Sequence, residues 1–192
     1  MRADAIVFGI AGALFGVIVG WVLGSQQTAR EARGAAPAGQ AAPAQQPAAA
    51  VPLDPARVKA LEEAAGQNPK DVQARVQLGN MYFDAEQYPQ AITWYEQAIA
   101  LNPSDTNVST DLGVAYYYTN QADRALTQFE HSLKTDPRHI KTLLNVGIVR
   151  AFGKSDFAGA GRAWQQVVDL APGSSEAQAA RKGLEGIKAS GK

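Results

Sequence analysis

A fixed period of 34 residues most limits what this chain can fold into. Three glycines and four prolines keep this period, with the last proline one residue late. They are Gly79, Gly113 and Gly147, and Pro69, Pro103, Pro137 and Pro172. A period of about 20 to 50 residues is typical of stacked repeats, each of which buries its apolar side against its neighbours. Because the apolar residues between the prolines follow a helical periodicity, the spacing predicts an all-α solenoid of helical hairpins.

The period divides the C-terminal part of the chain into three hairpins and two flanking helices. We predict hairpins at residues 72–105, 106–139 and 140–174, an N-terminal capping helix at 53–68 and a C-terminal capping helix at 175–189. Ser175 and Gln178 have the spacing of a capping box at the start of the last helix. Capping helices are expected because a terminal repeat would otherwise expose its apolar side.

Small and large side chains recur at fixed places in the three hairpins. They are Leu78, Gly79, Tyr82, Ala91, Tyr95, Ala98 and Pro103 in the first, Leu112, Gly113, Tyr116, Ala125, Phe129, Ser132 and Pro137 in the second, and Val146, Gly147, Ala160, Trp164, Val167 and Pro172 in the third. This pattern closely resembles the tetratricopeptide (TPR) repeat over about residues 53–189. Gly and Ala are expected where the two helices of a hairpin cross, and the aromatic rings are expected between successive hairpins.

The third hairpin departs from the pattern in two ways. Arg150 stands where a large aromatic residue is expected, and one extra residue is inserted near Lys154 to Asp156. We expect the insertion to alter the turn between the two helices without removing the repeat.

The resemblance implies a protein-binding groove lined by the first helix of each hairpin. Transferring the family's groove positions gives Gln73, Val76, Asn80, Phe83 and Asp84, then Asn107, Thr110, Val114, Tyr117 and Tyr118, then Lys141, Leu144, Ile148, Ala151 and Phe152. Four aromatic residues among them, Phe83, Tyr117, Tyr118 and Phe152, are predicted to form a contact strip for a peptide. The alternative is that some of these rings pack between repeats as core.

Chaperone-binding TPR domains hold a terminal carboxylate with a clamp of five basic and amide side chains. Here Asn80 and Lys141 match the clamp, whereas Val76, Asp111 and Asn145 occupy its other places. Because Asp111 would repel a carboxylate, the resemblance implies an internal or apolar peptide rather than an acidic C-terminal tail.

Residues 5–24 predict a membrane anchor. They contain no charged side chain, and about 20 apolar residues match the thickness of a bilayer core. A cleaved signal peptide is the alternative, but its apolar region is normally about 7 to 15 residues long. Residues 25–52 are rich in Ala, Pro, Gln and Gly and predict an extended linker.

Four glycines in the predicted membrane helix lie on one face. Gly12, Gly16, Gly20 and Gly24 recur every four residues. Such a face lets helices approach closely in lipid, and it predicts association with another copy or with a different membrane helix. Gly is also common in membrane helices without such a role.

Composition excludes several classes of function. Lys and Arg together number 18, as do Asp and Glu, so no net charge favours nucleic acid. The chain has no Cys, and its two histidines, His131 and His139, are not spaced as metal ligands on one helix face. No nucleophile and base pair, phosphate loop or metal cluster is recognisable. We therefore expect neither an enzyme nor a bound cofactor or metal.

The predicted function is a membrane-anchored scaffold or adaptor that binds a protein or peptide client. An N-terminal anchor, a linker and a TPR stack resemble bacterial envelope proteins, including the TPR components of cytochrome c maturation. That resemblance implies a single-pass inner-membrane protein, assembly of an envelope complex, and a TPR domain outside the cytoplasm. The alternative is a structural protein whose glycine-rich helix and repeats drive homo-oligomerisation.

Overall fold

The structure, a computed structural model, describes residues 51–191. The predicted membrane helix at 5–24, its face of Gly12, Gly16, Gly20 and Gly24, and the predicted linker as far as residue 50 lie outside this range. Among the helices within it, none combines the length and apolar character needed to cross a bilayer.

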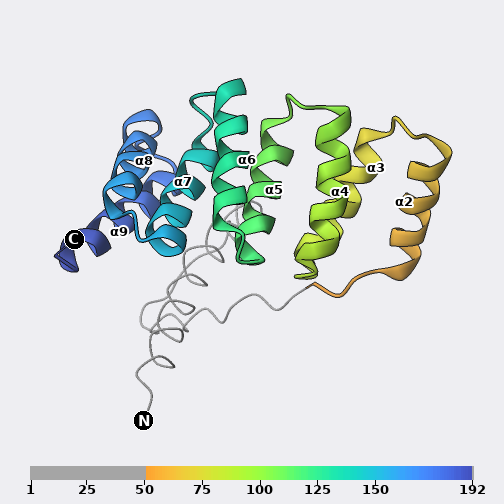
Figure 1. Cartoon of the computed structure of the whole chain (residues 1–192), viewed down its shortest axis with the longest axis horizontal. Coiled ribbons are helices and arrows are strands. Elements are labelled where there is room, and N and C mark those ends of the chain that lie inside the picture. The colour runs from red at the N-terminus through yellow and green to blue at the C-terminus, as the bar shows by residue number, and fades with distance from the viewer. Residues whose placement is uncertain (1–50, 192) are drawn as a thin grey trace, which may run out of the picture. The chain divides into compact units, whose positions relative to one another are not determined.

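The described residues form an all-α stack of helices, as the period predicted. The helices are α2 (Pro55–Gln67), α3 (Val72–Asp84), α4 (Tyr88–Leu101), α5 (Thr106–Tyr118), α6 (Ala122–Thr135), α7 (Ile140–Ile148) with its continuation η2 (Val149–Gly153), α8 (Phe157–Leu170) and α9 (Ser175–Ala189). They follow one another along the stack in chain order (Figure 1). The antiparallel pairs α3/α4, α5/α6 and α7/α8 are the three hairpins, and α9 packs on α8.

Side chains placed just before the helices satisfy their free N–H groups. Asp71 accepts a hydrogen bond from the N–H of Ala74 at the start of α3. Asp105, 34 residues later, does the same for Val108 in α5. At α9 the N-cap is Ser174, whose hydroxyl accepts from the N–H of Ala177, so the predicted capping box on Ser175 is wrong by one residue. Each such cap stabilises a helix by about 1 kcal/mol.

Each of the periodic glycines lies directly beneath an aromatic ring of the same hairpin. A Cβ atom on Gly79 would lie 2.5 Å from Cδ1 of Tyr95, and one on Gly113 would lie 2.6 Å from Cδ1 of Phe129. Trp164 covers Gly147 in the same way. The prediction that the rings fill the space between successive hairpins is therefore corrected for Tyr95 and Phe129, which pack on the glycine of their own hairpin where the missing Cβ leaves room.

Trp164 makes a second contact of this kind. A Cβ on Gly183 of α9 would lie 2.6 Å from Cζ3 of the same indole ring. The indole N–H donates to the carbonyl of Leu144, 3.1 Å away, so this ring is both buried and satisfied. One side chain thus holds α7, α8 and α9 together.

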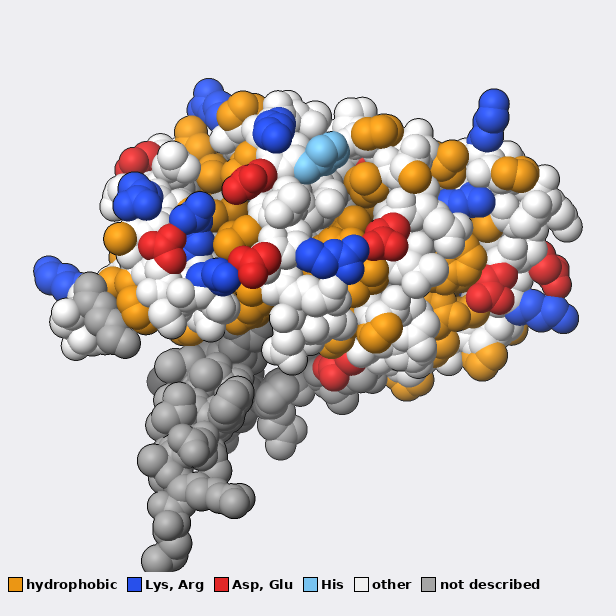
Figure 2. All heavy atoms as spheres, in the orientation of Figure 1, with side chains coloured by type: hydrophobic (Ala, Val, Ile, Leu, Met, Phe, Trp, Pro, Cys, Tyr) orange, Lys and Arg blue, Asp and Glu red, His pale blue; other side chains and the backbone are white. Residues whose placement is uncertain are grey.

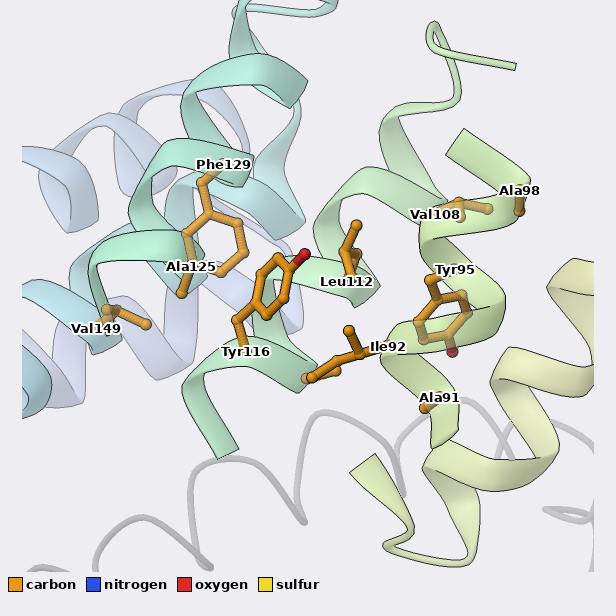
Figure 3. Packing of buried hydrophobic residues seen from close by; sticks show 11 residues of the cluster. Ala91, Ile92, Tyr95, Ala98, Val108, Leu112, Tyr116, Ala125, Phe129 and Val149 are labelled. Carbon is orange, nitrogen blue, oxygen red and sulfur yellow. The ribbon is translucent and has the colours of Figure 1, made fainter. Parts of the chain in front are cut away.

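Apolar side chains of α4 and α5 join the first two hairpins. Ile92 of α4 lies beside Leu112 and Tyr116 of α5 (Figure 3), all within one buried cluster. Phe129 in the same cluster is completely buried. Burial of one such side chain is worth about 1.5 to 3 kcal/mol, which makes these contacts the main source of stability of the stack.

The extra residue of the third hairpin lies inside its first helix, not in the turn. Each turn between paired helices has three residues, and its central residue has a left-handed backbone: Glu86 (φ 58°), Asn120 (φ 61°) and Ser155 (φ 54°). The turn expected to change is therefore preserved. The additional residue is instead accommodated by the π-helix η2, since a π-turn takes one residue more than an α-turn.

We expect Gly113→Ala to destabilise the stack because its new methyl group would overlap the ring of Phe129. Overpacking of a well-packed core costs about 1 to 3 kcal/mol. Gly186→Ala is the matched control: no atom lies within 4 Å of its Cβ position, so it should leave stability unchanged or raise it by up to about 1 kcal/mol. Urea denaturation followed by circular dichroism measures both. Equal effects of the two substitutions would contradict the crossing contact.

Candidate peptide-binding surface

The predicted groove positions lie on α3, α5, α7 and η2, and we call the face that they form the first-helix surface. Its exposed members are Gln73, Asn80, Asp84, Asn107 and Phe152, and its half-buried members are Val76, Phe83, Val114, Tyr117, Tyr118 and Lys141. Thr110, Leu144, Ile148 and Ala151 are wrong as contact residues, because each is at most 3% exposed. The surface is thus narrower than predicted.

Thr110 is buried because it belongs to a cluster of hydroxyl groups between the second and third hairpins. Its Oγ1 lies 2.6 Å from Oγ1 of Thr142, which lies 2.9 Å from Oγ of Ser132. All three side chains are fully buried. At the corresponding places between the first two hairpins stand Val76, Val108 and Ala98. A satisfied polar cluster fixes one arrangement of its partners, since any displacement leaves a buried hydroxyl unpaired.

His139 closes this cluster at its solvent side. It takes the N-cap position of α7, where the first two hairpins have Asp71 and Asp105, but its ring makes no cap hydrogen bond. Instead Nδ1 lies 2.7 Å from Oγ1 of Thr142, and Nε2 lies 3.2 Å from Oδ1 of Asn107. Burial lowers the pKa of the imidazole, so the folded protein favours its neutral form.

Four aromatic rings form a continuous strip at the ends of α3 and α5. Phe83 meets Tyr118 edge to face at 6.0 Å between ring centroids, and Tyr88 stacks on Tyr118 at 4.5 Å. Tyr117 follows at 6.4 Å from Tyr118. These are favourable aromatic geometries. The rings therefore pack against one another between hairpins, and Phe83, Tyr117 and Tyr118 are half-buried.

The π-helix moves Phe152 into register with Phe83 and Tyr117. The left-handed turn residues Asn120 and Ser155 correspond, so counting back three residues from each pairs Tyr117 with Phe152. The contacts agree with this pairing. In the first interface Tyr118 packs on Phe83 and Tyr88, and in the second Gly153 packs on Tyr117 and Ala122, 3.0 and 3.1 Å from its Cβ position.

One aromatic side chain therefore recurs at the same place in all three first helices. Phe83, Tyr117 and Phe152 occupy it, and Phe152 is 40% exposed. We call these three residues together with Tyr88 and Tyr118 the aromatic strip. Leu101 and Val51 are the other large apolar side chains that are exposed among the residues described. Phe152 is thus an unusual exposed ring rather than one of many.

The two side chains that match a carboxylate clamp are both engaged inside the protein. Lys141 Nζ lies 2.6 Å from Oδ1 of Asp111 in an ion pair whose side chains are 38% and 26% exposed. The hydroxyl of Tyr95 donates to Oδ1 of Asn80 at 2.8 Å. The one cation that matches the clamp is therefore already paired with a carboxylate of the protein.

Two carboxylates near these residues keep raised pKa values. Burial raises the pKa of Asp111 although Lys141 opposes the shift. Burial, together with the negative charge of Asp111, raises the pKa of Asp84. Both carboxylates act on the buried Tyr95 in the same direction. The charges of Asp84 and Asp111 thus repel one another, and Lys141 beside Asp111 neutralises one of the two.

Sequence reasoning missed three residues of this surface. Tyr88 and Glu86 lie in the second helix and the turn, outside the family positions that were transferred. Gly153 was missed because counting in a strict 34-residue register assigns its place to Phe152. The equal turns around Glu86, Asn120 and Ser155 show that the extra residue lies upstream of them, and this information comes from the structure.

The described structure also has a pocket away from the aromatic strip. An open pocket of about 330 Å³ lies on the second hairpin, lined by Tyr116, Asp123, Arg124, Thr127 and Gln128. Within residues 51–191 no group of three His, Asp or Glu side chains is placed to hold a metal ion. The molecular face in Figure 2 shows acidic and basic side chains interspersed, as expected of a solvated surface.

Comparisons with known proteins agree with this fold. Residues 79–120 match the family model described as TPR repeat. A crystal structure of MamA is similar, with a TM-score of 0.61 and 18% identity over 67% of this chain and 75% of that chain. The crystal structure of the Sgt2 TPR domain from Aspergillus fumigatus has a TM-score of 0.57 and 24% identity over 62% of this chain and 78% of that chain.

The second TPR domain of human RPAP3, in complex with an HSP70 peptide, is a further neighbour. Its TM-score is 0.54, with 23% identity over 59% of this chain and 92% of that domain. No curated protein sequence matches the chain. The family model thus matches a TPR repeat at residues 79–120, and the solved structures share the fold of the described part.

The lowered pKa of His139 predicts that the stack weakens in mild acid. Above the ordinary histidine pKa of 6.5 the ring is neutral in both the folded and the unfolded chain. As the pH falls through 6.5, the unfolded chain binds the proton first, so stability is lost down to the lowered pKa of the folded state. The charged groups that act on the ring are Asp105, Asp111, Asp136 and Lys141. All four are present in wild type and in the His139→Gln variant used for comparison.

The measurement is the free energy of unfolding of wild type and of His139→Gln at several values between about pH 7.5 and pH 5.5. Wild type should lose more stability over this range than the variant. Carboxylates with raised pKa values change the stability in the opposite direction as the pH falls, but they are present in both wild type and the variant. Identical slopes would contradict the proposed role of the neutral ring.

Proposed function

We propose that this chain is an adaptor that binds another protein through the first-helix surface of its TPR stack. The single observation that carries the proposal is the aromatic residue repeated at one place in three successive hairpins, Phe83, Tyr117 and Phe152. A peptide laid across the first helices would meet these side chains in turn. Aromatic side chains are frequent anchors in protein interfaces because they bury a large area at a small cost in side-chain entropy.

The partner segment is proposed to lie within a chain rather than at its C-terminus. RPAP3 is seen with the HSP70 peptide SGPTIEEVD, which ends in an acidic residue. In this chain Lys141 is held by Asp111, and Asn80 is held by Tyr95. Recruiting Lys141 to a carboxylate would break its ion pair, which argues for a different ligand.

The adaptor is further proposed to be held at a bacterial inner membrane, with the repeats outside the cytoplasm, and to serve the assembly of an envelope complex. The support is the uncharged apolar segment at 5–24 followed by the Ala- and Pro-rich segment at 25–52. A reporter active in one compartment, fused after Lys192, tests this arrangement. Activity confined to the cytoplasm would contradict it.

The experiment that tests the adaptor is site-specific photo-crosslinking of the full-length chain in cells. A photoreactive amino acid replaces Tyr117, and the matched control places it at Glu130, an exposed position on the second helix α6. We expect the Tyr117 probe to capture a distinct protein that the Glu130 probe does not.

Two outcomes would contradict the proposal. If both probes capture the same set of proteins in equal yield, the first-helix surface has no special role. If the Tyr117 probe captures only further copies of this chain, the homo-oligomeric alternative replaces the adaptor.

A further inference from the structure

We propose that the first-helix surface selects an internal peptide segment in which a Lys or Arg side chain accompanies apolar side chains. The basic side chain would pair with Asp84, and the apolar ones would cover the aromatic strip as far as Phe152. This inference rests on the proposed function and names the chemistry of its partner. It reverses the charge preference of a carboxylate clamp.

Three basic side chains around the surface are already paired within the protein. Lys141 binds Asp111 at 2.6 Å, Arg150 binds Asp156 at 2.6 Å, and Lys154 binds Asp123 at 2.7 Å. Each of these cations would have to leave an internal carboxylate before it could bind an acidic ligand. The pairs therefore remove positive charge from the binding surface.

The acidic side chains at the aromatic strip are not compensated in this way. Asp84 and Glu86 are both exposed and make no ion pair with any residue in the described range. They follow Phe83 along the chain, at the next and the third position. The charge of Glu86 also acts on the rings of Tyr88 and Tyr118, where burial is the larger cause and the pKa of Tyr88 is raised to about 12. These two carboxylates thus stand at the edge of the strip.

Of the two exposed acidic side chains, Asp84 is the one expected to bind a cation more strongly. It shares its surroundings with Asp111, and this like charge adds to burial in raising the pKa of Asp84. With Lys141 neutralising Asp111, the three side chains retain one net negative charge. A Lys or Arg from a ligand would relieve this repulsion, and electrostatic complementarity of this kind selects partners and speeds association.

The aromatic strip supplies apolar contacts beside the two acidic side chains, Asp84 and Glu86. Phe83, Tyr117 and Tyr118 are half-buried and Phe152 is 40% exposed. Negative charge beside aromatic faces also suits a cation, since the face of a ring attracts Lys and Arg. A segment with a basic residue at one end of an apolar run matches both features.

The first experiment is a selection of short random peptides by the purified full-length chain. The peptides are displayed inside a carrier protein, so that no free carboxyl terminus is present. We expect enrichment of sequences that join Lys or Arg to aromatic or aliphatic residues. On an Asp84→Lys variant we expect the preference for Lys and Arg to disappear.

The second experiment measures the affinity of one selected peptide by fluorescence anisotropy. Asp84→Asn should weaken binding by about tenfold, because it removes the charge and keeps the shape. Glu130→Gln, an exposed acid on α6, should leave the affinity unchanged. Asp84→Asn also removes a like charge from the side of Asp111, so the variant is expected to fold.

A second pair of variants tests the apolar part. Phe152→Ala should weaken the binding of the same peptide by about tenfold or more. Leu101→Ala is the matched control, since Leu101 is 39% exposed on α4 and Phe152 is 40% exposed on η2. Circular dichroism of all four variants verifies that they keep the helical content of wild type.

The outcomes separate this inference from the proposed function. Enrichment of neutral or acidic peptides that depends on Phe152 would overturn the basic preference and leave the adaptor standing. Failure to enrich any class over the Phe152→Ala variant would contradict both. Self-association that Phe152→Ala abolishes would show that a second copy occupies the surface, and it would also overturn the inference.

Discussion

The contact between a glycine and an aromatic ring inside each hairpin is the constraint on which the rest of the stack depends. Gly79 under Tyr95, and Gly113 under Phe129, let two helix backbones approach more closely than any residue with a Cβ would allow. The close crossing sets the shape of one hairpin, and the repetition of that shape sets how the next hairpin packs. The positions of the first-helix side chains follow from this geometry.

The two interfaces between hairpins use different chemistry for the same geometry. The first is apolar and aromatic, with Tyr118 packed between Phe83 and Tyr88. The second has small residues at the strip and the hydroxyl cluster of Thr110, Ser132 and Thr142 below it. Apolar contacts tolerate small displacements, whereas buried hydroxyl groups lose a hydrogen bond when they move. The second interface therefore has the more strictly defined register.

Sequence alone predicts the architecture because its determinants are local and periodic. Glycine, proline and apolar residues at a constant spacing fix the helix type, the number of hairpins and their order. The Asp residues before α3 and α5 carry the same period. None of this requires knowledge of which side chains meet across the stack.

The binding surface is predictable only in part, because it depends on contacts between distant residues. The burial of Thr110 depends on its contacts with Ser132 and Thr142, which lie 22 and 32 residues further along the chain. Nothing in the local sequence distinguishes an inserted turn residue from a π-turn, so the place of Phe152 was off by one. Pairing between Lys141 and Asp111, 30 residues apart, likewise appears only when the helices are packed.

The contacts of Trp164 affect how the C-terminal helices of the stack unfold. Because one indole packs on Gly147 and on Gly183, α9 cannot leave without exposing the ring that also closes the third hairpin. Fraying at the end of a repeat array ordinarily proceeds one element at a time. We therefore expect α7, α8 and α9 to open together, so that amide exchange in the three helices shares one opening event.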